Sequence, residues 1–199
     1  AGRALVLSWA GEFVDPAKVA IECEKGKKPR LRGSDFDWNL SHDHELIGLV
    51  THASQVGIDI CCAKSILQDG EDAREVLRPA YSSAFDELEW SYIYSSASEP
   101  ELLARFAQLW VVKEAFVKAV GAGLAVEPGR LHVELKGRPE VTFDGAPLLD
   151  WSFHIFSPME GYWVCVCGHA PGLAYSLEWR DWTQLALCLP PRRSLVKST

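Results

Sequence analysis

The sequence predicts an α+β fold with helices in its centre and short strands on either side. Short apolar runs bounded by turn residues lie before residue 63, apolar residues recur at helical spacing between 70 and 120, and partly alternating segments follow. A hydrophobic content of 48%, with eight Trp and eight Phe spread over 199 residues, supplies core material along the whole chain. We therefore expect two compact halves.

The first part of the chain is predicted to be rich in strands. Asp15 followed by Pro16 predicts one short helix through about Cys23, because Asp is a favoured N-cap and Pro is favoured at the first helical position. Gly, Pro and charged residues predict a loop over 25–33. The apolar runs predict three strands, of which the last two are joined by a short turn: 4–9, 45–52 and 55–62.

A long central helix is predicted to begin at Ser98. Ser98 is a favoured N-cap, and Glu101 three residues later completes a capping box. The helix is expected to run to about Val120, where Gly121 and Gly123 stop it. Helical spacing also predicts shorter helices before it, within 70–81 and 84–93.

The remaining segments are predicted to form an antiparallel meander, because Gly, Pro and Asp separate them and their apolar residues partly alternate. These segments are 131–137, 139–143, 151–157, 162–169 and 174–182. The tail from 190 to 199 is polar and basic, and we expect it to be frayed.

Composition narrows the class of protein. A formal net charge of -7 argues against nucleic acid as the general partner. No run of about 18 apolar residues predicts a membrane span, and the first residues lack the pattern of a signal peptide, so we expect a cytoplasmic protein. The six cysteines show no spacing typical of a zinc site or a disulfide framework.

Residues 110–124, WVVKEAFVKAVGAGL, contain the most informative pattern. Trp110, Glu114 and Lys118 are spaced i, i+4, i+8 and so form one stripe on the predicted helix. A Glu-to-Lys pair at this spacing is also an ordinary surface feature that stabilises a helix by about 0.2–0.5 kcal/mol. The pair alone therefore does not distinguish a site from a solvated helix face.

Asp59 interrupts an apolar strand between Ile58 and Ile60. A buried carboxylate needs a partner, because burying an unpaired charge is costly. Two interpretations follow: Asp59 is a hydrogen-bonded structural residue, or it is a ligand of Mg2+, which binds one or two carboxylates together with water and phosphate oxygens.

Two further segments, FDWNLSHDHE and GKKP, carry polar and basic residues. The basic run over 24–32 suits a small phosphorylated ligand or is a solvated loop. His42 and His44 lack a third nitrogen or sulfur ligand nearby and would bind zinc poorly. A phosphate contact from His42 alongside Lys27 or Lys28 fits the local positive charge better.

In the order GKKP, F-x-x-N-L-S-H, G-I-D-I and W-x-x-K-E-A-x-x-K, these motifs resemble the 4'-phosphopantetheinyl transferase superfamily. The resemblance covers roughly residues 24–124 and is to the larger type, in which one chain carries two similar halves. It implies two α+β halves packed as a pseudo-dimer, the first short or truncated. The implied units are a reduced N-terminal half with nucleotide-phosphate contacts, a C-terminal half with the metal site and catalytic helix, and a flexible tail: 1–54, 55–185 and 186–199.

The resemblance also implies an activity. Members transfer the 4'-phosphopantetheine group of coenzyme A to a serine of an acyl or peptidyl carrier protein, with Mg2+, in fatty acid, polyketide or nonribosomal peptide biosynthesis. Asp59 and Glu114 match the Mg2+ ligands, and Asp59 thereby approaches the pyrophosphate of coenzyme A. Glu114 matches the residue that deprotonates the carrier serine, and Lys118 the lysine that contacts the phosphate and assists the leaving group. A monomer is expected.

The nucleotide end of coenzyme A, including its 3'-phosphate, is implied to lie against Lys28, Ser41 and His42. Because GKKP has one residue more than the usual GKP of the family, Lys27 competes with Lys28 for this contact.

The sequence departs from the family pattern in two places. Cys61 stands where many members have a second acidic residue, and since thiolate suits Mg2+ poorly we expect water there instead. Only 25 residues precede Gly26, so the first half is reduced or truncated. Glu87 or Glu89 matches a further acidic position in an uncertain register. The alternative function is a non-catalytic coenzyme A or carrier-protein binding module with the same fold.

Overall fold

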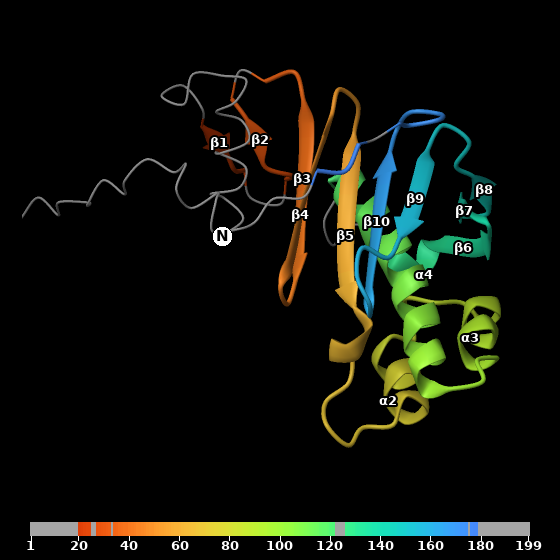
Figure 1. Cartoon of the computed structure of the whole chain (residues 1–199). Helices are drawn as coiled ribbons and strands as arrows, with labels where there is room; N and C mark the ends of the chain where they lie inside the picture. The colour runs from red at the N-terminus through yellow and green to blue at the C-terminus, as the bar shows by residue number, and fades with distance from the viewer. Residues whose placement is uncertain (1–19, 25–26, 33, 122–125, 175, 179–199) are drawn as a thin grey trace, which may run out of the picture.

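The computed structural model describes residues 20–24, 27–32, 34–121, 126–174 and 176–178 (Figure 1). Within these ranges the chain is α+β, as predicted. The helices are α2 (Ala73–Ala80), α3 (Glu87–Tyr94) and α4 (Glu99–Val120), with single turns η1 (Ala63–Ser65) and η3 (Pro128–Arg130). The strands are β1 (Ile21–Glu22), β2 (Arg30–Leu31), β3 (Asp37–Asp43), β4 (Leu46–His52), β5 (Val56–Cys62), β6 (Leu131–Lys136), β7 (Arg138–Phe143), β8 (Ala146–Pro147), β9 (Ser152–Phe156) and β10 (Tyr162–Gly168).

The strands of the described residues form four small antiparallel sheets, in the orders β1-β2, β3-β4, β5-β10-β9 and β6-β7-β8. Helix α4 packs along one face of the sheet β5-β10-β9 (Figure 1). The β3-β4 hairpin lies beside β5, and α2 and α3 pack at the end of α4 away from this hairpin (Figure 1). The fold thus brings the hairpin, β5 and α4 together.

Strand β5 is buried along its whole length and separates two apolar clusters. Cys61 belongs to the large core around α4, whereas Ile58 and Ile60 belong to a second cluster against β4. This division follows from the alternation of side chains along a strand. Asp59, like Cys61, therefore lies on the helix side of β5.

Gly57 allows the close approach of β5 and α4. A Cβ atom at this position would lie 2.0 Å from the carbonyl oxygen of Ala115 and 2.7 Å from the amide nitrogen of Ala119. Both are backbone atoms of α4, so no side-chain rotation would relieve the overlap. Because Gly57 has no side chain, α4 can lie close to β5, and side chains of α4 can therefore contact Asp59.

The predicted ends of α4 are confirmed. Ser98 accepts a hydrogen bond from the Glu101 amide, and Gly121 ends the helix with φ of 67°, in the left-handed region. The capping box is displaced by one residue, because the Glu101 carboxylate accepts from the Ala97 amide at 2.8 Å and not from that of Ser98. Gly123 lies outside the described residues.

The structure corrects several predictions in the first part of the chain. Ile21–Glu22 is a strand paired with Arg30–Leu31, where a helix end and a loop were expected. Strand β3 was not predicted, although it pairs with β4 along its whole length. The strands expected over 45–52 and 55–62 are present as β4 and β5. The strand expected over 4–9 and the Asp15–Pro16 helix start lie outside the described residues.

The single meander expected after α4 is also wrong. Strands β6, β7 and β8 form their own sheet, while β10 pairs with β5 on one side and β9 on the other. Of the segment 174–182, the described residues 174 and 176–178 form no strand. The tail from 190 lies outside the described residues, and the pseudo-dimer of two similar halves stays a prediction.

No helix in the described part of the chain combines the length and the apolar character needed to cross a lipid bilayer.

Candidate functional site

Ser41, Asp59 and Lys118 meet in direct contact although they come from three different elements, β3, β5 and α4. The Lys118 Nζ lies 2.5 Å from Asp59 Oδ1 and donates to Ser41 Oγ at 2.9 Å. The Ser41 hydroxyl in turn donates to Asp59 Oδ1 at 3.0 Å. The sequence predicted that these residues share a site, and the structure brings them together.

Burial determines the electrostatics of this cluster. Asp59 is 5% exposed, and this burial raises the pKa of its carboxyl above the ordinary value, while Lys118 and Ser41 partly oppose the rise. The Lys118 side chain is 30% exposed, so the cluster opens to solvent on the lysine side. An ammonium group held here at a surface opening is suited to contact an anion.

Glu114 lies one helical turn before Lys118 and is half-buried. Burial and then the negative charge of Asp59 raise the pKa of Glu114, opposed by Lys118. Within the described residues, no hydrogen bond or ion pair engages the Glu114 carboxylate, because Lys118 pairs with Asp59. The ordinary Glu-to-Lys surface pair is therefore not formed.

Cys61 lies on the same face of β5 as Asp59 but belongs to the large core, at 8% exposure. Burial, followed by the charges of Asp59 and Asp43, raises the pKa of the Cys61 thiol to about 12. The thiol is therefore protonated near neutral pH and is a poor ligand for a hard cation.

The two lysines of GKKP have different surroundings. Lys28 is 12% exposed, lies 2.5 Å from Asp37 Oδ2 and donates to the Val56 carbonyl at 2.6 Å. Burial lowers the pKa of Lys28, and Asp37 opposes this. Lys27 is 70% exposed and pairs with Glu24. Neither lysine forms a hydrogen bond or an ion pair with Ser41, Asp59 or Lys118.

His42 is exposed, whereas Ser41 beside it is buried. Adjacent residues of a strand point to opposite faces, so the two side chains predicted to hold the nucleotide lie on different faces of β3. Asp37 and Asn39 share the Ser41 face, although neither was predicted from the sequence to lie near the site. The signal was the alternation of polar residues with Trp38 and Leu40 along β3.

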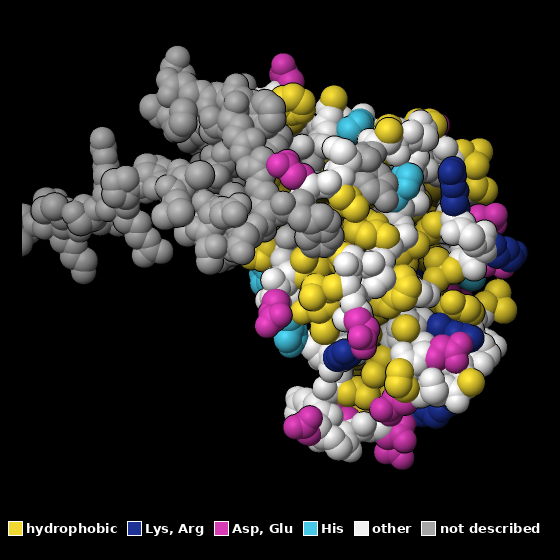
Figure 2. Space-filling model, in the orientation of Figure 1, with side chains coloured by type: hydrophobic (Ala, Val, Ile, Leu, Met, Phe, Trp, Pro, Cys, Tyr) yellow, Lys and Arg dark blue, Asp and Glu magenta, His cyan; other side chains and the backbone are white. Residues whose placement is uncertain are grey.

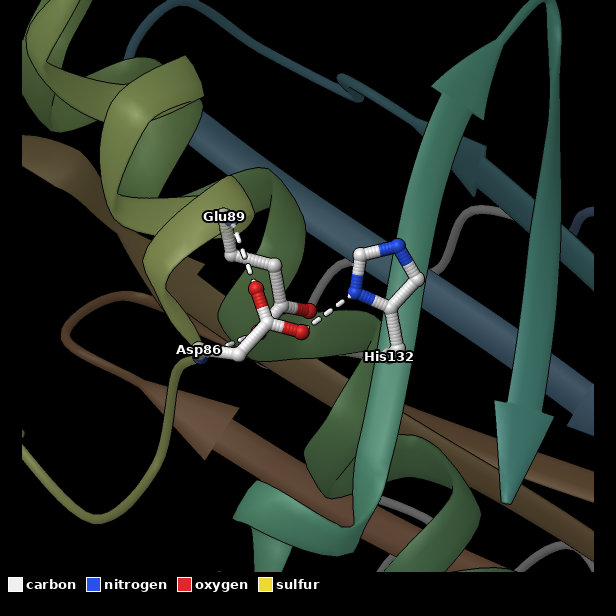
Figure 3. Close-up of side chains that lie close together, drawn as sticks. All are labelled: Asp86, Glu89 and His132. Atoms are coloured by element: carbon white, nitrogen blue, oxygen red, sulfur yellow. Dashed lines mark hydrogen bonds and ion pairs between the residues drawn. The ribbon is translucent and has the colours of Figure 1, made fainter. Parts of the chain in front are cut away.

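A second group of potential ligand atoms comes from Asp86, Glu89 and His132, which lie within 4.8 Å of one another (Figure 3). Figure 3 shows Asp86 turned toward both its own helix and the His132 ring. Asp86 and Glu89 form the capping box of α3. The Glu89 carboxylate also accepts from the Val133 amide at 2.9 Å and from Lys113 at 2.8 Å. These bonds occupy Glu89, so the group does not fit a metal ion and is a structural network.

Charged side chains are dispersed on the face shown in Figure 2, where acidic and basic groups alternate with apolar ones. No single basic surface dominates this view, in agreement with the formal net charge of -7.

A family model described as the 4'-phosphopantetheinyl transferase superfamily matches residues 55–167. A phosphopantetheinyl transferase of Thraustochytrium sp. is 30% identical over 168 residues, which cover 78% of this chain and 58% of that protein. The L-aminoadipate-semialdehyde dehydrogenase-phosphopantetheinyl transferase of Homo sapiens is 28% identical over 190 residues, covering 86% and 60%. The chain thus spans little more than half the length of these two relatives.

Among solved structures, a holo-(acyl-carrier-protein) synthase from Bacillus anthracis in complex with CoA (3',5'-ADP) is 21% identical, with a TM-score of 0.44. The match covers 57% of this chain and 93% of that chain. A similarity this low supports no inference about the site.

Proposed function

Because the chain belongs to the 4'-phosphopantetheinyl transferase superfamily, we propose that it transfers the 4'-phosphopantetheine group of coenzyme A to a serine of an acyl or peptidyl carrier protein, in the presence of Mg2+. The observation that carries the proposal is the direct contact of Lys118 with Asp59 and Ser41, with Glu114 one turn away, whose carboxylate has no hydrogen-bond or ion-pair partner in the part of the chain that the structure describes. The i, i+4 pair that would make Glu114 and Lys118 an ordinary surface feature is absent from the described ion pairs.

Asp59 and Glu114 would hold the Mg2+ ion. Both offer carboxylate oxygens, the donor type that Mg2+ prefers. The negative charge of Asp59 opposes ionisation of Glu114 and raises its pKa, and a divalent cation between the two carboxylates would relieve this repulsion. The protonated Cys61 thiol beside Asp59 offers no competing charge. When bound, the ion would supply neutralisation of the pyrophosphate charge.

In the proposed reaction, the carrier serine oxygen forms a bond to the phosphorus that bears the pantetheine arm. The bond from this phosphorus to the bridging oxygen breaks, and adenosine 3',5'-bisphosphate leaves. Glu114 accepts the serine proton, directly or through water, and its raised pKa suits this role. Lys118 contacts the phosphate and stabilises the negative charge that develops on the leaving oxygen.

The nucleotide end is proposed to lie toward β3 and the GKKP segment. Ser41 is the member of this group that already contacts Lys118, and its hydroxyl lies where a phosphate oxygen bound to Lys118 would approach. His42 and Lys27 are exposed, and Lys28 is bound to Asp37. Contacts from these three residues to the 3'-phosphate stay predictions, as do the monomeric state and the cytoplasmic location.

Mass spectrometry of an apo carrier protein, incubated with the full chain, coenzyme A and Mg2+, tests the proposal. We expect the carrier serine to gain one phosphopantetheine group, and chelation of the metal by EDTA to stop the gain. Asp59→Ala should abolish transfer without unfolding the chain. Binding of coenzyme A without transfer to any of several acyl and peptidyl carrier proteins would contradict the proposal and support the non-catalytic binding module.

A further inference from the structure

The amides of β5 that face away from β10 are bonded to side chains and not to a neighbouring backbone. Alternate residues of a strand direct their N–H groups to opposite edges, and one edge of β5 pairs with β10. The other edge carries the amides of every second residue of β5, and each of these four amides donates to a side chain of β3. The bonds are Val56 N to Asp37 Oδ2 at 2.8 Å, Ile58 N to Asn39 Oδ1 at 3.0 Å, Ile60 N to Ser41 Oγ at 3.2 Å and Cys62 N to Asp43 Oδ2 at 2.6 Å.

We call these four β3 residues the polar row: Asp37, Asn39, Ser41 and Asp43. Each member is separated from its β5 partner by the same 19 residues, so β3 runs parallel to β5 in one constant register. All four side chains are short and carry an oxygen close to the backbone. An apolar side chain in the row would leave a buried amide of β5 without an acceptor, which is costly.

The row fixes the position of Ser41 in particular. Its oxygen accepts from the Ile60 amide and from Lys118, and its hydroxyl hydrogen is donated to Asp59. A shift of β3 by one register step of two residues would move this hydroxyl by about 6.6 Å along β5, beyond reach of these partners. Without the other three members of the polar row, only the hydrogen bonds of Ser41 itself would oppose such a shift.

We propose that Asn39 and Asp43, the neighbours of Ser41 in the polar row, are positioning residues that hold Ser41 against Asp59 and Lys118. This inference rests on the proposed function for its consequence in coenzyme A binding. Asn39 and Asp43 bond to the Ile58 and Cys62 amides on either side of Ile60, and so fix β3 before and after the site. They act on the phosphate end of coenzyme A through Ser41, without touching it.

Amide hydrogen exchange of the full chain, followed by NMR, tests the positioning step. Asn39→Leu keeps the approximate volume of the side chain and removes the acceptor, whereas Asn39→Asp keeps an oxygen acceptor. In the Leu variant we expect exchange at Ile58 to accelerate by about tenfold or more relative to the amides of α4. The decisive amide is Ile60, because its own acceptor Ser41 is unchanged. It should accelerate as well, and Asn39→Asp should restore slow exchange at both amides.

Calorimetric binding of coenzyme A provides the second measurement. Asn39→Leu should weaken binding by about fivefold or more, and in the transfer assay this loss should appear in KM more than in kcat, since Ser41 acts on the bound ground state. Acceleration confined to Ile58, or equal behaviour of the Leu and Asp variants, would overturn the inference. A wild-type chain that fails to bind or transfer would contradict the proposed function, whereas the exchange of Ile60 decides the positioning role separately.

Discussion

At the scale of single residues, Glu114 is the group whose surroundings best separate catalysis from helix stability. Glu114→Gln keeps the size of the side chain and removes both the proposed base and one charge of the proposed metal site, so turnover should fall by a factor on the order of 100 or more. The carrier-protein assay at saturating coenzyme A measures this. Since Glu114 has no ion-pair partner among the described residues, a lost helix pair offers no other explanation. Normal turnover in the Gln variant would remove Glu114 from the mechanism.

The same substitution should have a pH-dependent effect on stability. Burial raises the pKa of Glu114 in the folded protein above its ordinary value of 4.5, so ionisation of this carboxyl opposes folding. The loss of folding stability caused by this ionisation is absent at a pH below the ordinary pKa. It grows as the pH rises toward the raised pKa of the folded state and is constant above that pKa. In metal-free buffer, Glu114→Gln should therefore melt at a higher temperature than wild type at neutral pH. The difference should vanish near about pH 4.

Thermal melts of both proteins across this pH range check the sign. A melting difference that is as large in acid as at neutral pH would show that some other property of the glutamine, and not the ionisation of Glu114, causes it.

Alanine variants of Lys27 and Lys28 should differ in their effects: we expect one to change coenzyme A binding and the other to change stability. Lys28 bonds to Asp37 and to the Val56 carbonyl, so Lys28→Ala should lower the free energy of unfolding by about 2 kcal/mol. Lys27 is exposed, and its pair with Glu24 adds little to stability. Lys27→Ala should leave urea unfolding unchanged and raise the KM for coenzyme A but not for the 3'-dephospho form. If only Lys28→Ala abolished the difference in KM between coenzyme A and 3'-dephospho-coenzyme A, the contact to the 3'-phosphate would belong to Lys28 and not to Lys27.

At the scale of elements, the approach of α4 to β5 depends on Gly57. Gly57→Ala should cost about 1–3 kcal/mol of stability, because its Cβ would meet the backbone of α4 at Ala115. Activity should fall as well, since the helix that carries Lys118 must move away from Asp59. Urea unfolding and the transfer assay, run at a temperature at which the variant is folded, measure both effects.

Gly129 provides a matched control for Gly57. A Cβ there would lie 2.1 Å from the Ser83 carbonyl oxygen, an overlap of similar size, but η3 carries no proposed site residue. Gly129→Ala should lose stability while transfer by the folded protein stays normal. Equal loss of activity in the two alanine variants would mean that general destabilisation, and not the position of α4, explains Gly57.

Helix α4 could be predicted from sequence because its signals are local. Ser98 and Gly121 mark the two ends, and both act through atoms within a few residues. Strand β3 could not be predicted in the same way, because Asn39 and Ser41 are residues of loops as often as of strands. Their hydrogen bonds go to β5, 19 residues away, and only the folded chain supplies these amides.

At the scale of the whole molecule, Lys113 connects three elements. This residue is adjacent to Glu114, the proposed base, yet its side chain is fully buried and bonds to Glu89 of α3 and to the carbonyl of Leu131, where β6 begins. Lys113→Met would leave the Glu89 carboxylate buried without its cation, and should cost about 3–5 kcal/mol.

Adding Glu89→Gln to Lys113→Met should recover part of this loss, because no buried charge remains and the glutamine oxygen can still accept from the Val133 amide. Chemical denaturation of the two single variants and the double variant gives the coupling free energy. Additive losses would contradict a buried ion pair between α3 and α4.

Some of the residues singled out from the sequence lie together in the structure, but the way they are arranged was not predictable. Asp59 was predicted from the cost of burying a carboxylate in an apolar strand, and the structure supplies the partners that this cost requires, Lys118 and Ser41. The burial of Lys28 was not predictable, because its partner Asp37 is on a strand that the sequence did not reveal. For the same reason it was not predictable that the side chains of Ser41 and His42 point to opposite faces, because both residues belong to β3.

The polar row also determines where this chain can be cut. The proposed boundary before β5 would detach β3 from β5, and the amides of Val56, Ile58, Ile60 and Cys62 would lose their acceptors together. A fragment that starts at β5 would present an open, apolar strand edge, which is a template for pairing with another copy. Dissection of the chain at residue 54 should therefore yield a C-terminal piece that aggregates unless the hairpin is supplied in trans.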